Sequence, residues 1–190
     1  SYRQNFRQVV LLPKLQKALR NINPFLTDAQ MDEVVTRITC FSTGKLLENN
    51  EKVLELLLNG TTVSKNEGTG EMSPNVHYID FNHPEKNILT AISEFKVAIP
   101  GTDHHIVPDI VLFVNGLPLV LVEAKSPKLI EPIAEAIDQM MRYSEQRGDI
   151  GEGNQELFAY NQILVATCRN QAKFGTISCH NDKYFFRWTD

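Results

Sequence analysis

Residues 108–125, PDIVLFVNGLPLVLVEAK, constrain the fold most strongly, because they predict a β-hairpin with a defined register. Asn115-Gly116 separates two runs of apolar β-formers, and Asn-Gly in this setting is the strongest short-range signal for a two-residue hairpin turn. A hairpin closed there pairs Asp109 with a position at or next to Glu123. Opposed residues on one face of such a pair have Cβ atoms about 4.5–5.5 Å apart.

Charged side chains therefore gather at one end of an otherwise apolar ribbon. Side chains alternate between the two faces of a strand, so Lys125 shares a face with Glu123. Charges beside a core cost free energy unless they are paired or bind a ligand, and two carboxylates can hold a hard divalent cation. The spacing alone also fits solvated charges at a strand end, since Asp followed by Glu-x-Lys arises by chance in many proteins.

The two expected strands, 110–114 and 119–122, are apolar on both faces. This pattern is typical of central strands that are covered on two sides. Further strands are expected near 76–81, 92–99 and 162–168. Helices are expected from residue 9 to near 21, from a Thr27-Asp28 cap to about 39, from 48 to 58 and from about 132 to 147. The sequence therefore predicts an α/β fold with a mixed β-sheet flanked by helices on both faces.

The fourth helix presents two distinct sets of side chains. Its core stripe consists of Ile133, Ile137, Met140, Met141 and Ser144. Gln139 and Tyr143 are four residues apart, so they share a face at the edge of that stripe. Such positions allow an amide and a phenol to reach the hairpin. The alternative is that both side chains are half-buried for packing alone.

Asp109 and Glu123-x-Lys125, preceded by Pro108, resemble the PD-(D/E)xK nuclease motif. The whole segment with its VNGLPLV turn resembles the N-terminal nuclease domain of the type I restriction-modification enzyme R subunit. The resemblance extends over residues 9–188. Gln139 and Tyr143 match the family's Q-x-x-x-Y element. The segment 78–81 with Asn87 resembles the strand and turn before the hairpin, and the segments 174–176 and 184–188 resemble the domain's closing segment.

This resemblance implies a restriction-endonuclease-like core and Mg²⁺-dependent cleavage of double-stranded DNA. It implies that Asp109 and Glu123 bind the metal ion, with the Ala124 carbonyl as a further ligand. It implies that Lys125 orients the attacking water or stabilises charge in the transition state. Gln139 and Tyr143 would brace the metal site or contact the DNA backbone.

The family also implies partners. ATP-driven translocation belongs to helicase-like domains C-terminal to the nuclease domain, and methyltransferase and specificity subunits complete the complex. Related nucleases take a further acid from an early helix, which we expect before Ser1, because Glu33 and Glu51 are expected on solvated faces. We therefore expect weak or no activity in isolation.

The resemblance implies one nuclease domain over residues 1–190, a fragment of a larger R subunit. The length suits one domain with a sizeable core. Three cysteines without a CxxC pair favour a reducing, cytoplasmic environment, with Cys168 in the core. We expect no signal peptide and no membrane span. The chain opens on Ser1 rather than methionine, as a processed chain or fragment would.

The net charge of −4 argues against a free-standing DNA-binding protein, because phosphate neutralisation supplies most non-specific affinity. A local basic set remains, and it either lines one face or belongs to a solvated mixed-charge surface: Lys125, Lys128, Arg142, Arg147, Arg169 and Lys173. Two other motifs are weak. Residues 42–45, STGK, lack the rest of a phosphate loop, and His104-His105 lacks a third ligand at zinc-like spacing.

Three functions remain open from the sequence. The first is the endonuclease domain of a type I R subunit, a site-specific deoxyribonuclease. The second is a docking module with a silent nuclease site that contacts partner subunits. The third is an independent PD-(D/E)xK nuclease, against which the acidic charge weighs.

Overall fold

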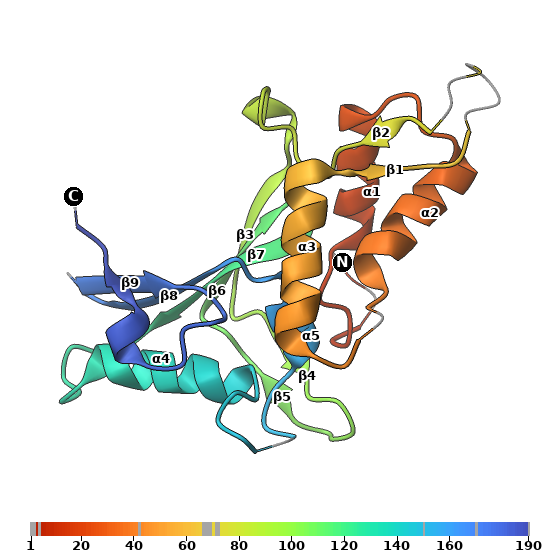
Figure 1. The fold of residues 1–190 in the computed structure, drawn as a ribbon. Coiled ribbons are helices and arrows are strands. Elements are labelled where there is room, and N and C mark those ends of the chain that lie inside the picture. Colours follow the sequence, from red (N-terminus) through yellow and green to blue (C-terminus); the bar gives the residue numbers. More distant parts are fainter. Residues whose placement is uncertain are drawn as a thin grey trace.

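A computed structural model describes residues 3, 5–41, 43–65, 70, 73–149, 151–169 and 171–189 (Figure 1). Its helices are α1 (Leu12–Ile22), α2 (Asp28–Thr39), α3 (Leu46–Asn59), α4 (Pro132–Tyr143) and α5 (Gln155–Tyr160), with short 3-10 turns η1 (Pro84–Lys86) and η2 (Asp182–Tyr184). Its strands are β1 (Thr61–Thr62), β2 (Asn75–Val76), β3 (Leu89–Ser93), β4 (Val97–Ala98), β5 (His105–Ile106), β6 (Ile110–Val114), β7 (Leu117–Ala124), β8 (Ile163–Cys168), β9 (Gln171–Gly175) and β10 (Phe186–Arg187).

The central sheet has six strands in the order β10-β9-β8-β7-β6-β3. Strands β7 and β8 are parallel, and every other pair in this sheet is antiparallel. The crossover between β7 and β8 contains α4 and α5. The predicted α/β class and mixed sheet are thereby confirmed, and they are consistent with a restriction-endonuclease-like core.

The predicted hairpin forms with its turn at Asn115-Gly116. Both residues have positive φ, 54° and 82°, as a two-residue turn that follows the right-handed strand twist requires. Ile110 opposes Val122, so the next positions outward, Asp109 and Glu123, oppose each other. The register shifts by one residue between Leu112 and Phe113, at a bulge nearer the turn.

The turn is buried rather than exposed. The Asn115 side chain donates to the Tyr78 carbonyl at 2.7 Å and to Asn87 Oδ1 at 2.8 Å, and it accepts from the Ile88 amide at 2.7 Å. A Cβ on Gly116 would lie 2.6 Å from the Leu11 carbonyl oxygen, so the N-terminus of α1 can approach only a glycine.

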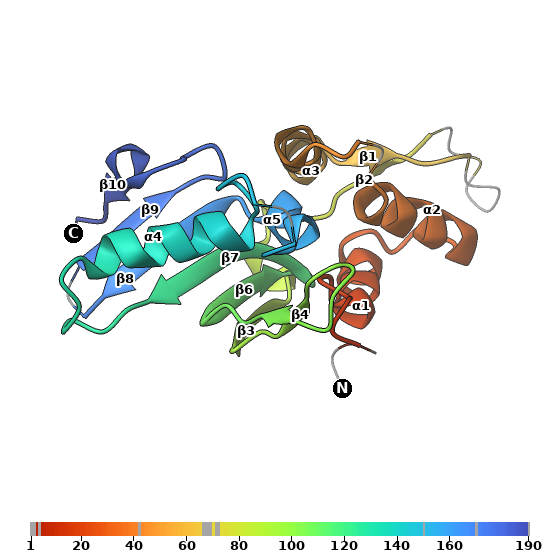
Figure 2. The same ribbon diagram turned by 90° about the horizontal axis from the view of Figure 1, so that it is seen from below.

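The first three helices lie together at the turn end of the hairpin (Figure 2). The cap predicted at Thr27 is confirmed: its side chain accepts from the Gln30 amide while the Gln30 side chain accepts from the Thr27 amide. The predicted ends of these helices agree within about three residues, apart from the apolar start at residue 9, which precedes α1 as an extended buried segment.

The stripe predicted on α4 is confirmed, because all five of its residues are buried. The helix ends at Tyr143 rather than near 147. Glu145 adopts a positive φ of 59°, and the Gln146 amide donates to the Met141 carbonyl, as in a C-terminal cap that usually contains glycine. The absence of glycine there explains why the sequence predicted a longer helix.

Two strand predictions need correction. The segment 76–81 is extended only through Val76, because the backbone groups of His77, Tyr78 and Asp80 bond to asparagine side chains instead of to a neighbouring strand. The segment 92–99 is divided between β3 and β4. The sequence also missed α5, within the gap after residue 148, and the strands β9 and β10.

Among the residues that the structure describes, helices cover one face of the central sheet. Helix α4 lies across β7 and β8 (Figure 2), and the side chains of β6 and β7 that point to it are buried. On the opposite face, β6 exposes Ile110 and Leu112, each at 37%. The fold thus differs in this respect from the expectation of helices on both faces.

Two smaller expectations can be compared with the structure. Cys168 is buried as expected, and all three cysteines are free. Over the described ranges, no helix is both long and apolar enough to cross a membrane.

Candidate active site

Asp109 and Glu123 come together at the open end of the hairpin. Asp109 directly precedes β6, and its Oδ2 accepts a hydrogen bond of 2.7 Å from the amide of Ala124 on β7. Glu123 lies opposite, on the face that α4 covers. The predicted proximity of these two side chains is confirmed.

Glu123 is fully buried, and its two oxygens have different surroundings. Oε2 accepts from Gln139 Nε2 at 2.9 Å and lies 3.8 Å from Lys125 Nζ. Oε1 is buried and accepts no hydrogen bond of ordinary geometry, while the side chain and backbone of Asp109 lie close to this carboxyl. Burial, and then the negative charge of Asp109, raise the pKa of Glu123 to about 8.

A ladder of polar side chains joins these acids to α4. Lys125 Nζ donates to Gln139 Oε1 at 2.5 Å, and Gln139 Nε2 also donates to the Tyr143 hydroxyl at 3.0 Å. Burial, and then the charge of Glu123, raise the pKa of Tyr143. The five residues Asp109, Glu123, Lys125, Gln139 and Tyr143 thus form one contiguous set. The hairpin register predicted the meeting of the first three, and the family resemblance predicted that Gln139 and Tyr143 join them.

The oxygen donors of this set fit a hard divalent cation. Mg²⁺ binds to one or two carboxylates and keeps several waters, and an unpartnered carboxylate oxygen beside a second carboxylate offers such ligands. The only other buried side-chain oxygen without a partner among the described residues is Asn161 Oδ1, which belongs to a neutral amide. Within that part of the chain, no cluster of three or more His, Cys, Asp or Glu residues could hold a metal ion.

The other candidate residues lie outside this set. Glu33 pairs with Arg37 on α2, and Glu51 is exposed on α3, as expected. His105 packs edge-on against Phe6, and His104 is exposed. In the STGK segment, residue 42 lies outside the described residues, and the remainder precedes α3 as a turn.

The basic set does not form one free face. Arg147 pairs with Asp138 at 3.0 Å, and Lys173 pairs with Asp182 at 2.6 Å. Near the acids lie Lys125 itself and Arg142, whose guanidinium lies 5.3 Å from the Tyr143 ring centroid. Lys128 and Arg169 are exposed in loops.

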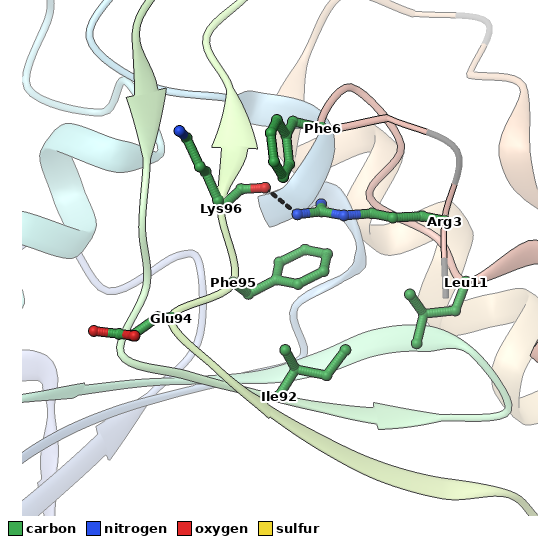
Figure 3. Close-up of a pocket in the computed structure, with 7 residues that line it drawn as sticks. All are labelled: Arg3, Phe6, Leu11, Ile92, Glu94, Phe95 and Lys96. Carbon is green, nitrogen blue, oxygen red and sulfur yellow. Dashed lines mark hydrogen bonds between the residues drawn. The ribbon is translucent and has the colours of Figure 1, made fainter. Parts of the chain in front are cut away.

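A hollow of about 260 Å³ lies between the N-terminal residues Arg3, Phe6 and Leu11 and the segment 92–96 (Figure 3). The Arg3 guanidinium fills part of it, 4.0 Å from the Phe95 ring centroid, and donates to the Lys96 carbonyl. The Glu94 amide donates to the Asp109 carbonyl at 2.9 Å, so this wall holds the backbone of the acid in place. None of the five predicted site residues lines the hollow.

Sequence reasoning missed the backbone donors of the site. The Ala124 amide donates to Asp109, and the Val107 backbone, close to the Tyr143 hydroxyl, acts to lower the pKa of Tyr143. A backbone amide leaves no trace in residue identity. Only the hairpin register, which puts Ala124 beside Asp109, provided an indirect signal.

Comparison with known proteins gives a consistent result. The family model described as type I restriction enzyme R protein N terminus matches residues 1–182. The type I restriction enzyme HindI endonuclease subunit of Haemophilus influenzae is 30% identical over 176 residues, which is 93% of this chain and 16% of that subunit. A Methanocaldococcus jannaschii protein, named as the putative MjaIXP endonuclease subunit of such an enzyme, is 28% identical over 184 residues, 96% of this chain and 17% of that protein. The chain therefore spans about one sixth of the length of these curated relatives.

Proposed function

The chain belongs to the family of type I restriction enzyme R protein N-terminal domains, and from this premise we propose that it is the Mg²⁺-dependent endonuclease domain of an R subunit. It hydrolyses phosphodiester bonds of double-stranded DNA after ATP-driven translocation by other domains of that subunit. The observation that carries this proposal is the buried, unpartnered Oε1 of Glu123 beside Asp109. A buried carboxylate oxygen without a partner costs free energy, and a cation removes that cost.

Asp109 and Glu123 would hold the metal ion, with the Ala124 carbonyl as a further ligand. The Ala124 amide orients Asp109, and Gln139 orients Glu123 through its 2.9 Å hydrogen bond. Bound Mg²⁺ supplies charge neutralisation at the scissile phosphate and a lowered pKa for a bound water. Outer-shell partners such as Gln139 commonly change metal affinity or activity by about 10–100-fold.

Lys125 acts on the reacting groups. Its ammonium would orient the attacking water and stabilise the added negative charge in the transition state. The water oxygen forms a bond to phosphorus and loses a proton to solvent, while the bond from phosphorus to the leaving sugar oxygen breaks and that oxygen takes a proton from solvent. Gln139 holds this ammonium through its Oε1, and Tyr143 fixes the Gln139 amide. Gln139 and Tyr143 are therefore positioning residues.

The proposal is tested in an R subunit that carries this domain, assembled with methyltransferase and specificity subunits and supplied with ATP, Mg²⁺ and plasmid. We expect Asp109→Asn and Glu123→Gln each to lower the cleavage rate about 100-fold or more, since each removes a ligand of the ion that stabilises transition-state charge. Asp138→Asn is the matched control, because Asp138 is an exposed acid on α4 that pairs with Arg147. Unimpaired cleavage by either site variant would falsify the assignment.

The same assay separates the two alternative functions. An independent nuclease cuts plasmid without ATP and partner subunits, whereas the proposed domain requires them for full activity. A silent docking module binds no Mn²⁺ at Asp109 and Glu123 and leaves cleavage unaffected by either substitution.

A further inference from the structure

Apart from Ser93 and Thr167, the strand residues on the face of the central sheet opposite α4 are apolar. The strand register places Ser93, Ile110, Val122, Val165, Phe174 and Phe186 in one continuous row. A parallel row over four strands consists of Ala91, Leu112, Val120 and Ile163. Directly paired residues share a face. We call these two rows, with Leu89 of β3, the open face.

No residue of the open face is fully buried. Ile163 is 40% exposed, Phe186 68% and Leu89 73%. The residues that alternate with them, such as Val111, Leu121 and Leu164, are completely buried on the α4 side. The two sides of the sheet are therefore equally apolar, and only one is covered by the described part of the chain.

Such a face is unusual for a surface that stays in water. Antiparallel strands that face solvent on one side normally alternate between apolar and polar residues. Among the residues of the open face, Ser93 is the only polar one, and none is charged. Large contiguous exposed apolar patches mark contact sites for proteins or membranes, or ligand-binding grooves.

The chemistry of the open face restricts its partner. Duplex DNA requires Lys or Arg to neutralise phosphates, and the open face contains neither. Arg187 follows Phe186 on β10 and lies opposite Lys173 in the strand register. Because side chains alternate along a strand, its side chain lies on the other side of the sheet from Phe186. The open face therefore fits an apolar partner surface rather than a phosphate backbone.

The end of the described chain lies at the open face. Trp188 packs edge-on against Phe174 of the open face, with ring centroids 5.4 Å apart. In the curated relatives, the matched segment is only 16–17% of the subunit. The remaining polypeptide of such a subunit is covalently joined to this domain, so its effective concentration over a neighbouring surface reaches the millimolar range.

We propose that, in an R subunit, the open face is the docking surface for an apolar face of the polypeptide outside this domain. This inference rests on family membership and on the open face, and it does not depend on nuclease activity. A tethered occupant is favoured over a second copy of this chain, because the second copy has to bind from dilute solution and pay the full entropy of association.

Hydroxyl-radical footprinting tests this docking on unmodified side chains. Oxidation of Leu112, Ile163 and Trp188 is compared between the 190-residue chain and an R subunit that carries it. An effective concentration of about 1 mM and a dissociation constant of about 0.1 mM leave about one molecule in ten open, so we expect oxidation to fall about ten-fold. Leu54 and Leu58 of α3, exposed at 40% and 58%, are the internal controls and should be oxidised equally in both proteins.

Two results would overturn the proposal. Equal oxidation of the open face in both proteins means that nothing in the subunit covers it. The second result is that the open face of the 190-residue chain becomes more protected from oxidation as the protein concentration rises, and that light scattering detects a dimer. A second copy of the chain then covers the open face instead.

A charge substitution provides an independent measurement. In the R subunit, Leu112→Glu should restore oxidation of Ile163 to the level of the 190-residue chain, whereas Leu54→Glu should leave Ile163 protected. Leu112 is already partly exposed, so the introduced carboxylate is hydrated in the open domain. Protection of Ile163 that persists in Leu112→Glu contradicts the docking. Because no readout uses cleavage, failure of the proposed nuclease function would leave these results unchanged.

Discussion

The two ends of the β6–β7 hairpin both bury polar side chains, and they treat them in opposite ways. At the turn, every polar atom of the buried Asn115 side chain has a partner. At the other end, Glu123 is equally buried, yet its Oε1 has no partner and its pKa is raised to about 8. The first arrangement stabilises the fold. The second costs free energy until a ligand is bound, which is typical of a functional site.

Asn115→Ala should have the largest effect on stability. It leaves the Tyr78 carbonyl and the Ile88 amide without their side-chain partner, and it puts alanine at a positive φ. We expect the free energy of unfolding to fall by about 3–4 kcal/mol, measured by urea denaturation. Asn161→Ala, at a buried asparagine with one unpartnered oxygen, should cost less. If wild type and Asn115→Ala have equal free energies of unfolding, the hydrogen bonds of Asn115 at the turn do not stabilise the fold.

The pH dependence of unfolding should distinguish the Glu123 end. In metal-free protein its pKa rises from an ordinary value of 4.5 to about 8, so the folded state holds the proton more tightly. Its contribution to the free energy of unfolding is therefore fully present below pH 4.5 and is lost as pH rises through about 8. We expect this loss to be about 2–4 kcal/mol in wild type relative to Glu123→Gln, measured in EDTA. If the free energy of unfolding depends on pH identically in the two proteins, the pKa of the Glu123 carboxyl is not raised in the folded state.

Gln139→Ala should affect the site without affecting the turn. Its amide joins Lys125, Glu123 and Tyr143, so its loss frees the ammonium and the carboxylate that it orients. We expect cleavage by the assembled R subunit to fall about 10–100-fold, with a change in Mg²⁺ dependence. Gln162→Ala, at a half-buried glutamine before β8, is the matched control. A loss of stability without any shift in Mg²⁺ dependence would indicate a packing role alone.

Tyr143→Phe should have the smallest effect. It removes one hydrogen bond to Gln139 and keeps the ring that packs beneath Arg142. We expect a loss of about 0.5–1.5 kcal/mol, or roughly two- to ten-fold in cleavage rate. A loss as large as that of Asp109→Asn would instead assign Tyr143 a direct contact with DNA.

The two ends also differ in how far they could be predicted from sequence. The Asn-Gly signal is local, so it predicted the turn, the register and hence the meeting of Asp109 with Glu123. Helical spacing predicted the edge position of Gln139 and Tyr143 on α4. The burial of Asn115 was not predicted, because its partners at Tyr78 and Ile88 come from a segment that the sequence assigned in part to a strand.

The remaining misses have physical causes. Residues 157–160 of α5 are all buried, so this six-residue helix has no amphipathic period to detect. The open face consists of β-formers on strands whose apolar pattern predicts cover on both sides. Residue pattern therefore indicated that the face should be covered, and only the structure shows that the described residues do not cover it.

Calorimetric titration of the metal-free chain with Mn²⁺ at pH 7, in two buffers of different ionisation enthalpy, tests the metal site most directly. The account predicts binding accompanied by release of about one proton, because the ion displaces the proton that the raised pKa keeps on Glu123. It also predicts that Glu123→Gln abolishes this proton release and weakens binding. Wild-type protein that binds no Mn²⁺, or a Glu123→Gln variant that binds it equally well, would contradict the claim that Asp109 and Glu123 form a divalent-cation site.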